Sequence, residues 1–395
     1  MLSHNVVWVS TFNVCYSFGK ELAKRGWEVE ILTISPHRKW GKIHSYMQDG
    51  VLISEFPDLL WGPLRSGWDI YDTLRRIAYL RKKKYDLIWA FDSRPAVIFP
   101  ALYGKYFKGI PHFSFWGDWW GRGGAIRQRT RYRLLSRLFE PLETFFEEGF
   151  RSHSVGMTTV SNALRQRAIK LGFPPERIRV INSGSDVEGI RFLDKTVCKE
   201  KLHLPANSVV INYSGFTHYD VNLVLDAFAE YNKHNPNSYL IMTGSDLGIQ
   251  RDRYPELVLN SKIRHVGLVF QKEMQDVLGA TDIFFLPLTP TLANEARFPI
   301  RFFMYCAAGR PVITNPVGDI PEYYKNHEIG AVVDSTPHAM ATAVQYLVSD
   351  PSRLTRLNKN VRHFAETVVS TSYYTDKLLA FWMSIPEIRA IDSKG

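Results

Sequence analysis

Short apolar runs alternate with longer segments of helical spacing along the first half of the chain. The apolar runs lie at residues 5–9, 28–33, 51–56, 87–90 and 111–115. The helical segments lie at residues 16–24, 71–84 and 95–106. Strands of this length separated by helices are typical of βαβ units, which build a parallel sheet covered by helices on both faces.

The same alternation begins again after residue 190. Apolar runs lie at 209–213, 239–243, 263–266, 283–286 and 311–314, and helical segments at 221–234, 271–280 and 299–308. The pattern therefore predicts an α/β protein with two doubly wound halves. Ligands of such sheets bind beyond the carboxyl ends of the strands, so we expect the halves to face a central cleft.

Composition is consistent with two globular domains. The chain has 395 residues, of which 45% are hydrophobic and 22% charged. Its three cysteines have no paired spacing, which argues against a disulfide framework or a zinc ribbon. It shows neither 18 consecutive apolar residues nor a basic segment at its start. We therefore expect a cytoplasmic protein, with association at a membrane surface left open.

The excess of positive over negative charge lies entirely in the first half. Residues 1–190 hold 28 Lys and Arg against 18 Asp and Glu, whereas residues 191–395 hold 21 of each. The densest basic parts are residues 81–84 and the arginines at 127, 129, 131, 133 and 137. A basic face attracts nucleic acid, anionic lipid or a phosphorylated acceptor, but it can equally be a solvated surface.

A series of short motifs resembles one family. Residues 155–335 include TTVS at 158–161, INSGSD at 181–186, ATDIFFLP at 280–287, AAGRPVI at 307–313 and GDIPE at 318–322. In this order and spacing they resemble the family 4 glycosyltransferases of the GT-B fold. The resemblance implies two Rossmann-like domains, residues 1–185 for the acceptor and 186–370 for the donor. A C-terminal helix within residues 371–395 would cross back onto the first domain.

The resemblance also implies an activity. The protein would transfer a sugar from a nucleotide-diphosphate sugar to a carbohydrate or to a lipid-linked or polysaccharide intermediate, with retained configuration. It would need no metal or other cofactor. Gly215 and Glu322 match family positions for donor binding, and His218, Arg297 and Arg301 could contact the diphosphate. Met304 replaces the second glutamate of the family's Glu-x7-Glu pattern.

A tryptophan-rich loop is the candidate acceptor and catalytic segment. Trp116, Trp119 and Trp120 could stack on sugar faces, and Asp118 could take the acceptor proton or stabilise positive charge on the reacting sugar. The alternative is an aspartate that caps a helix among buried tryptophans. Residues 92–95 form a similar loop at a strand end and are the less favoured candidate for the same role.

Two further alternatives remain open. Helical spacing at residues 126–151, with arginines near its start, suits a helix on an anionic membrane, or else a core helix with a basic edge. Because Met304 replaces that glutamate, the chain could instead be a non-catalytic GT-B protein that binds a sugar or a partner. The basic first half also suggests nucleic-acid binding, but no nucleic-acid motif is recognisable, so we expect no nucleic-acid partner.

Overall fold

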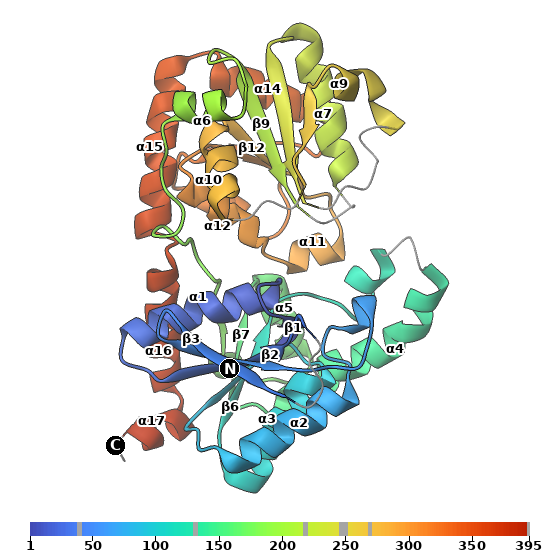
Figure 1. Ribbon diagram of the computed structural model, residues 1–395, viewed down its shortest axis with the longest axis vertical. Coiled ribbons are helices and arrows are strands. Elements are labelled where there is room, and N and C mark those ends of the chain that lie inside the picture. Colours follow the sequence, from blue (N-terminus) through green and yellow to red (C-terminus); the bar gives the residue numbers. More distant parts are fainter. Residues whose placement is uncertain (38–41, 129–132, 216–219, 245–251, 268–270, 393–395) are drawn as a thin grey trace. The chain divides into compact units, whose positions relative to one another are not determined.

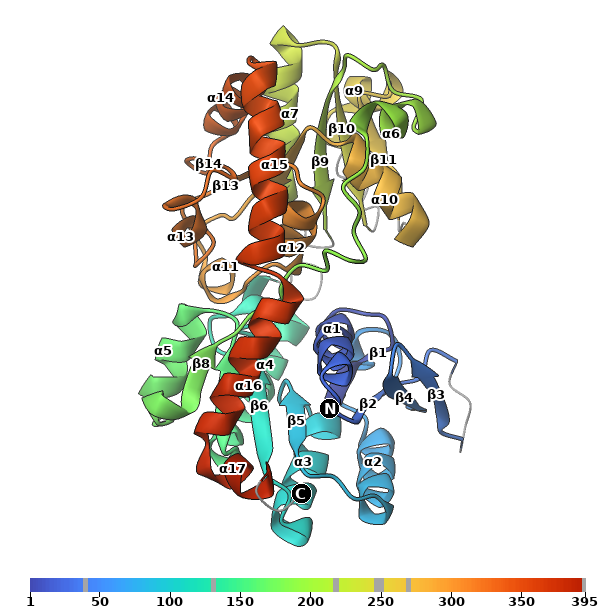
Figure 2. The same cartoon turned by 90° about the vertical axis from the view of Figure 1, so that its left-hand side faces the viewer.

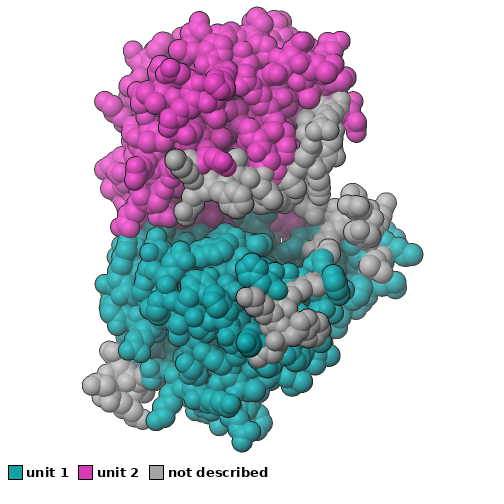
Figure 3. Space-filling view, in the orientation of Figure 1, with its two compact units in different colours: residues 1–183, 296–298, 371–395 teal, residues 184–295, 299–370 magenta. Residues whose placement is uncertain are grey.

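The computed structural model describes residues 1–37, 42–128, 133–215, 220–244, 252–267 and 271–392. The chain divides into two compact units (Figure 3). Unit 1 comprises residues 1–183, 296–298 and 371–395, and unit 2 comprises residues 184–295 and 299–370. The segment 296–298, which the sequence placed in the second domain, belongs to unit 1.

Unit 1 is built on an eight-stranded sheet across the described residues, in the order β3-β4-β2-β1-β5-β6-β7-β8. All neighbouring strands are parallel except β3 and β4. The strands are β1 (Leu2–Val6), β2 (Val29–Ile34), β3 (His44–Gln48), β4 (Val51–Phe56), β5 (Ile88–Phe91), β6 (His112–Trp116), β7 (Gly156–Thr159) and β8 (Ile178–Val180). Every residue of β5 and β6 is buried, which explains the uninterrupted apolar run of β5.

Helices cover both faces of this sheet (Figures 1 and 2). Helix α1 packs beside α16, and α2 packs beside α3 on the opposite face. The α-helices of unit 1 are α1 (Thr11–Lys24), α2 (Ile70–Lys82), α3 (Pro95–Lys108), α4 (Arg133–Gly149), α5 (Asn162–Lys170), α16 (Thr371–Ser384) and α17 (Pro386–Asp392). Short 3-10 turns are η1 (Gly62–Leu64), η2 (Ala125–Gln128), η3 (Arg151–His153) and η4 (Pro175–Arg177).

The core of unit 1 contains an ion pair. Leu2, Leu32 and Phe56 are among its buried apolar side chains. Asp72 and Arg76 face each other one helical turn apart on α2, and both side chains are fully buried. The Arg76 guanidinium also donates to backbone oxygens of neighbouring elements. Burial raises the pKa of Asp72 to about 7, although Arg76 acts in the opposite direction.

Helix α16 is fixed to unit 1 by aromatic and polar contacts. The Trp382 ring lies 5.7 Å from that of Trp27 and 5.2 Å from that of Trp89, measured between centroids. Arg25, which follows α1, donates to the Asp376 carboxylate at 2.7 Å. These contacts explain why the C-terminal segment belongs to unit 1.

Unit 2 holds a six-stranded parallel sheet across its described residues, in the order β11-β10-β9-β12-β13-β14. The strands are β9 (Val209–Ser214), β10 (Ser238–Thr243), β11 (Ile263–His265), β12 (Ile283–Leu286), β13 (Val312–Thr314) and β14 (Gly330–Val332). The helices are α6 (Lys195–Lys201), α7 (Val221–His234), α9 (Pro255–Leu259), α10 (Gln271–Ala280), α11 (Leu292–Ala296), α12 (Ile300–Ala307), α13 (Pro321–Tyr324), α14 (Pro337–Val348) and α15 (Pro351–Thr367). Its core lies largely between the sheet, α7 and α14.

Three of the differences from the sequence prediction concern unit 1. The first strand covers Leu2–Val6 rather than residues 5–9, and a turn follows it. Strand β3 was missed, because its mostly exposed side chains leave no apolar run. The helix predicted at 126–151 is described as η2 and α4, and residues 129–132 lie outside the described residues.

Candidate functional site

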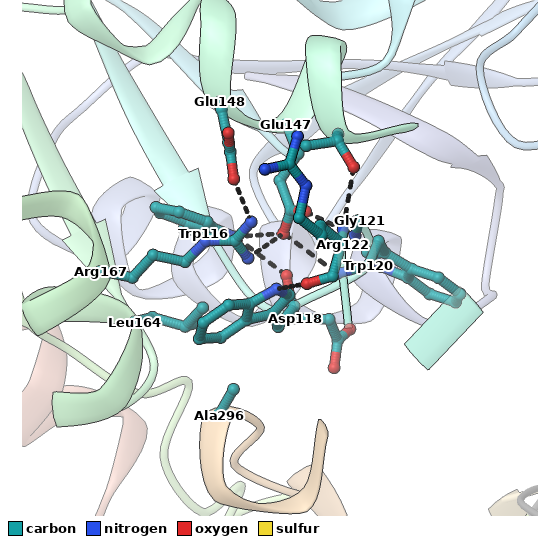
Figure 4. A network of polar contacts seen from close by, with 12 residues as sticks. Trp116, Asp118, Trp120, Gly121, Arg122, Glu147, Glu148, Leu164, Arg167 and Ala296 are labelled. Carbon is teal, nitrogen blue, oxygen red and sulfur yellow. Dashed lines mark hydrogen bonds and ion pairs between the residues drawn. The ribbon is translucent and has the colours of Figure 1, made fainter. Parts of the chain in front are cut away.

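The loop after β6 carries Asp118 at the carboxyl end of the parallel sheet of unit 1. Trp116 ends the strand, and the loop over residues 117–124 lies against α4 (Figure 4). The indole Nε1 of Trp116 donates to the Asp118 carbonyl and to a Glu147 carboxylate oxygen, both at 2.9 Å. Glu147 also accepts from the backbone N–H groups of Trp120 and Gly121, at 3.0 and 2.6 Å.

The environment of Asp118 suits proton transfer. Its carboxyl group is only partly exposed, and burial raises its pKa to about 6. The negative charges of Asp92 and Glu147 act in the same direction, while Arg297 acts against them. A carboxylate with a raised pKa is a stronger base, yet it remains mostly ionised at neutral pH.

The three predicted acceptor tryptophans lie in different surroundings. Trp116 has no exposed surface, so its ring is unsuited to stacking on a sugar; the Arg151 guanidinium lies 4.1 Å from its centroid. The Arg167 guanidinium lies 3.7 Å from the centroid of Trp119. Trp120 keeps partial exposure. The prediction of an acceptor role is therefore wrong for Trp116, because the ring is part of the core.

A buried charged cluster lies beside this loop. Asp92 follows β5 with a positive φ of 77°, and its carboxylate is 3.6 Å from His4 Nε2. Arg94 and Arg151 also face it, at 3.9 and 3.8 Å. His4 and these arginines hold the pKa of Asp92 below its usual value, although burial acts in the opposite direction.

The sequence reasoning missed a cavity in unit 1. It has a volume of about 640 Å³ and is lined by Asn5, Val6, Val9, Trp61, Gly62 and Arg65. The side chain of Trp61 is 77% exposed, although tryptophan is usually well covered. A tryptophan, an amide and a guanidinium around one hollow can contact both the apolar and the hydroxyl faces of a sugar.

The turn after β1 adopts backbone angles that favour glycine. Trp8 has φ 65° and Ser10 has φ 44°. Non-glycine residues in such conformations carry strain and cluster at functional sites. Trp8 packs edge-on against Phe12 and Tyr16.

The candidate donor site of unit 2 lies where β9 and β10 end. Gly215 follows β9, and Gly244 follows β10 with φ 116°. A Cβ atom on Gly215 would lie 2.1 Å from Arg301 Nη1, and one on Gly244 would lie 2.3 Å from the Gly215 carbonyl oxygen. Residue 244 therefore requires glycine, whereas a Cβ atom at residue 215 would displace the Arg301 guanidinium. Both strand ends present bare backbone to a ligand.

Arg301 is fixed against this edge. Its Nη1 donates to the Ser214 carbonyl at 2.8 Å, and its guanidinium lies 4.9 Å from the Tyr213 ring centroid. The Tyr305 hydroxyl accepts from Ser214 N–H at 2.8 Å, and its ring stacks on Phe284. Arg301 Nε is buried without a hydrogen-bond partner among the described residues.

The other predicted donor residues are dispersed. Met304 lies one helical turn after Arg301 on α12 and is partly buried. Glu322 on α13 is largely exposed and pairs with Lys325 at 2.7 Å. Arg297 belongs to unit 1, where its positive charge acts to lower the pKa of Asp118, whereas Arg301 belongs to unit 2. His218 lies outside the described residues.

Two family descriptions match the chain. Glycosyltransferase Family 4 matches residues 12–188, and glycosyl transferases group 1 matches residues 197–364. The D-inositol 3-phosphate glycosyltransferase of Rhodococcus jostii is 27% identical over 220 residues, which are 53% of this chain and 47% of that protein. The chain thus spans about half the length of the curated relatives it matches.

Solved structures share the fold. A glycosyltransferase from Rickettsia africae is 16% identical with a TM-score of 0.71, and 97% of each chain is covered. The catalytic domain of starch synthase IV from Arabidopsis thaliana, bound to ADP and acarbose, is 15% identical with a TM-score of 0.70 and 99% coverage of each chain. HepE from Anabaena, in complex with UDP and glucose, is 14% identical with a TM-score of 0.67, covering 96% and 98% of the two chains.

The two family matches follow one another in the chain and fall largely on the two units. The chain therefore belongs to the family 4 type of GT-B glycosyltransferases, which confirms the family and the fold class predicted from its sequence.

Proposed function

We propose that the protein transfers a glycosyl group from a nucleotide-diphosphate sugar to a hydroxyl group of a carbohydrate or lipid-linked acceptor. The observation that carries this proposal is Arg301, held beside the glycine edge of β9 and β10 with one guanidinium nitrogen unpartnered. Strand-end glycines let phosphate oxygens approach backbone N–H groups, and a guanidinium neutralises their charge.

Unit 1 would bind the acceptor. The cavity beside Trp61, with Asn5 and Arg65 in its wall, offers an aromatic face and polar groups. Trp120 and the partly exposed Asp118 offer a second set of contacts at the end of β6. The sequence predicts acceptor contacts at the tryptophan loop alone, and Trp61 enlarges the candidate region.

The reaction conserves charge and atoms without a cofactor. The acceptor oxygen forms a bond to C1 of the donor sugar, while the bond from C1 to the diphosphate oxygen breaks and the diphosphate leaves with its electron pair. The acceptor proton passes to the Asp118 carboxylate. We propose that the acceptor oxygen reaches C1 from the face that the diphosphate leaves, so that the anomeric configuration is retained, and that no metal is required, as the resemblance to family 4 implies.

Nucleotide release tests the proposal. A panel of UDP-, GDP-, ADP- and dTDP-sugars is incubated with wild type and with Asp118→Asn, with simple glycosides as acceptors. We expect one donor class to release nucleotide, and the variant to lose about 100-fold or more of the rate. Turnover of no donor, or an equal rate in the variant, would count against the proposal. The anomeric signal of the product in proton NMR decides retention.

We also propose that the enzyme is cytoplasmic and that α4 rests on an anionic membrane. This position would bring the enzyme to a lipid-linked acceptor. Leu134 and Leu138 are 75% and 70% exposed, and Leu142 and Phe145 continue the same helical face. Arg127 and Arg137 are exposed nearby in the chain. Exposed leucines beside arginines suit the boundary of an anionic bilayer. No helix among the described residues is long and apolar enough to cross a membrane.

Vesicle flotation separates this surface from chance apolar exposure. We expect wild type to float with phosphatidylglycerol vesicles and not with phosphatidylcholine vesicles. The pair of substitutions Leu134→Gln and Leu138→Gln would abolish flotation, whereas Leu259→Gln, at an exposed leucine of unit 2, would not. Equal flotation of all variants, or none with anionic vesicles, would contradict the proposal.

A further inference from the structure

One face of α4 holds the backbone of the Asp118 loop. Glu140, Thr144 and Glu147 are spaced by four and three residues, so they project from the same side of the helix. Gly123 N–H donates to Glu140 at 2.9 Å, and Arg122 N–H donates to the Thr144 hydroxyl at 2.8 Å. Together with the two N–H groups that Glu147 accepts, four consecutive backbone donors of the loop end on this face.

Glu147 makes the largest share of these contacts. Its Oε1 accepts from the Trp116 indole and from Trp120 N–H, and its Oε2 accepts from Gly121 N–H. Figure 4 shows the carboxylate at the centre of these contacts, with the Asp118 side chain directed away from it. The carboxylate therefore fixes residues on both sides of Asp118 without bonding to its side chain.

The surroundings of Glu147 hold it in one place. Its side chain is 3% exposed, and Arg167 Nη1 lies 3.5 Å from Oε1. Arg151 Nε donates to the Glu147 carbonyl at 2.6 Å, and the same guanidinium lies on the Trp116 ring. A buried carboxylate is costly unless it is paired and hydrogen-bonded, and here both conditions are met.

The fit between loop and helix leaves no room for a side chain at residue 121. A Cβ atom on Gly121 would lie 2.6 Å from Glu147 Oε2 and 2.8 Å from the Thr144 Cα atom. The latter is backbone and cannot move aside without shifting α4. A substitution at Glu147 on α4 and a substitution at Gly121 in the loop should therefore each displace the loop independently.

We propose that Glu147 is the positioning residue of the Asp118 loop, fixing residues 116–121 so that the Asp118 carboxylate faces the substrate. The proposal rests on the proposed transferase function for its catalytic consequence, but the fixing of the loop can be measured without activity. Positioning of a catalytic group to within an ångström can be worth about 100-fold in rate.

Glu147→Gln is the decisive variant, because it keeps the size of the side chain. An amide has one accepting oxygen and one donating NH₂ group. Either the Gly121 N–H or the Trp116 and Trp120 pair must then face a donor. Glu148→Gln is the matched control: Glu148 is the neighbouring residue, it also pairs with Arg167, and none of its hydrogen bonds found among the described residues goes to the loop.

Hydrogen exchange of the peptide covering residues 117–124 gives the first readout. We expect Glu147→Gln to speed exchange of its protected N–H groups about 10-fold or more, and Glu148→Gln to leave it unchanged. Gly121→Ala, which changes no residue of α4, should speed the same exchange, and it replaces Glu147→Gln in the test if Glu147→Gln does not fold. Unchanged exchange in the folded Glu147 and Gly121 variants would overturn the proposal.

Kinetics gives the second readout. In Glu147→Gln we expect kcat to fall about 10- to 100-fold, with the KM for the nucleotide sugar within about twofold of wild type, since the donor site lies in unit 2. Faster exchange with an unchanged kcat would overturn the positioning role. If wild type itself transfers no sugar, the proposed function fails, and exchange alone still decides whether Glu147 fixes the loop.

Discussion

Replacing Asp118 with Asn should make the protein more stable while making it inactive. The folded protein raises the pKa of this carboxyl group from 3.8 to about 6, mainly by burial. The native state therefore binds the proton more tightly than the unfolded state, and the free energy of unfolding of wild type falls as pH rises from about 4 to about 6. Above pH 6 the loss is complete and amounts to at most about 3 kcal/mol, from a shift of about two pKa units.

An asparagine at residue 118 is neutral at every pH, so the variant does not lose this free energy of unfolding as pH rises. At pH 7 we expect urea denaturation to show Asp118→Asn more stable than wild type by about 1 to 3 kcal/mol, and the difference to shrink towards zero near pH 4. The kcat/KM of wild type should fall below about pH 6, as the base becomes protonated. A variant less stable than wild type at pH 7, or a difference that does not change with pH, would refute this description of the Asp118 site.

Three further predictions concern the donor edge, the core and the cofactor. Gly215→Ala should raise the Kd of the preferred nucleoside diphosphate about 10-fold in calorimetry, because its Cβ would displace the Arg301 guanidinium, while the melting temperature changes little; an unchanged Kd would contradict this. Arg76→Leu should lower the free energy of unfolding by about 3 to 5 kcal/mol in urea, since it strands Asp72 in the core, and the added change Asp72→Leu should recover part of the loss. Incubation with EDTA should leave nucleotide release unchanged, and a loss restored by Mg²⁺ would show a metal requirement.

Periodicity predicted the elements that are apolar on two faces or amphipathic. Strands β4 and β12 and helices α7 and α10 have the boundaries that the sequence indicates. Their boundaries could be predicted because burial leaves a regular pattern of apolar residues within each of these segments. Strand β3 was missed because it lies at the sheet edge with exposed side chains, and its antiparallel pairing with β4 is its main support.

The candidate site was only partly predictable, because many of its contacts join residues that are far apart in the chain. The position of Asp118 at a strand end and of Arg301 near Gly215 could be inferred from motif order. The partners of the Asp118 loop could not, because Glu147 lies 26 residues after Gly121 in the chain and no local pattern records the pairing. The burial of Trp116 likewise follows from tertiary packing, and the exposure of Trp61 had no sequence signal that we recognise.

The central claim is that unit 2 binds a nucleoside diphosphate through Arg301. The most direct test is a thermal-shift panel of UDP, GDP, ADP and dTDP with wild type, Arg301→Ala and the control Arg356→Ala, an exposed arginine of unit 2. A ligand at 100 times its Kd stabilises the folded state by about 2.7 kcal/mol. We predict that one diphosphate raises the melting temperature of wild type and of Arg356→Ala by several degrees, and that Arg301→Ala loses most of this shift. A panel in which no diphosphate shifts wild type, or in which Arg301→Ala responds as wild type does, would contradict the claim.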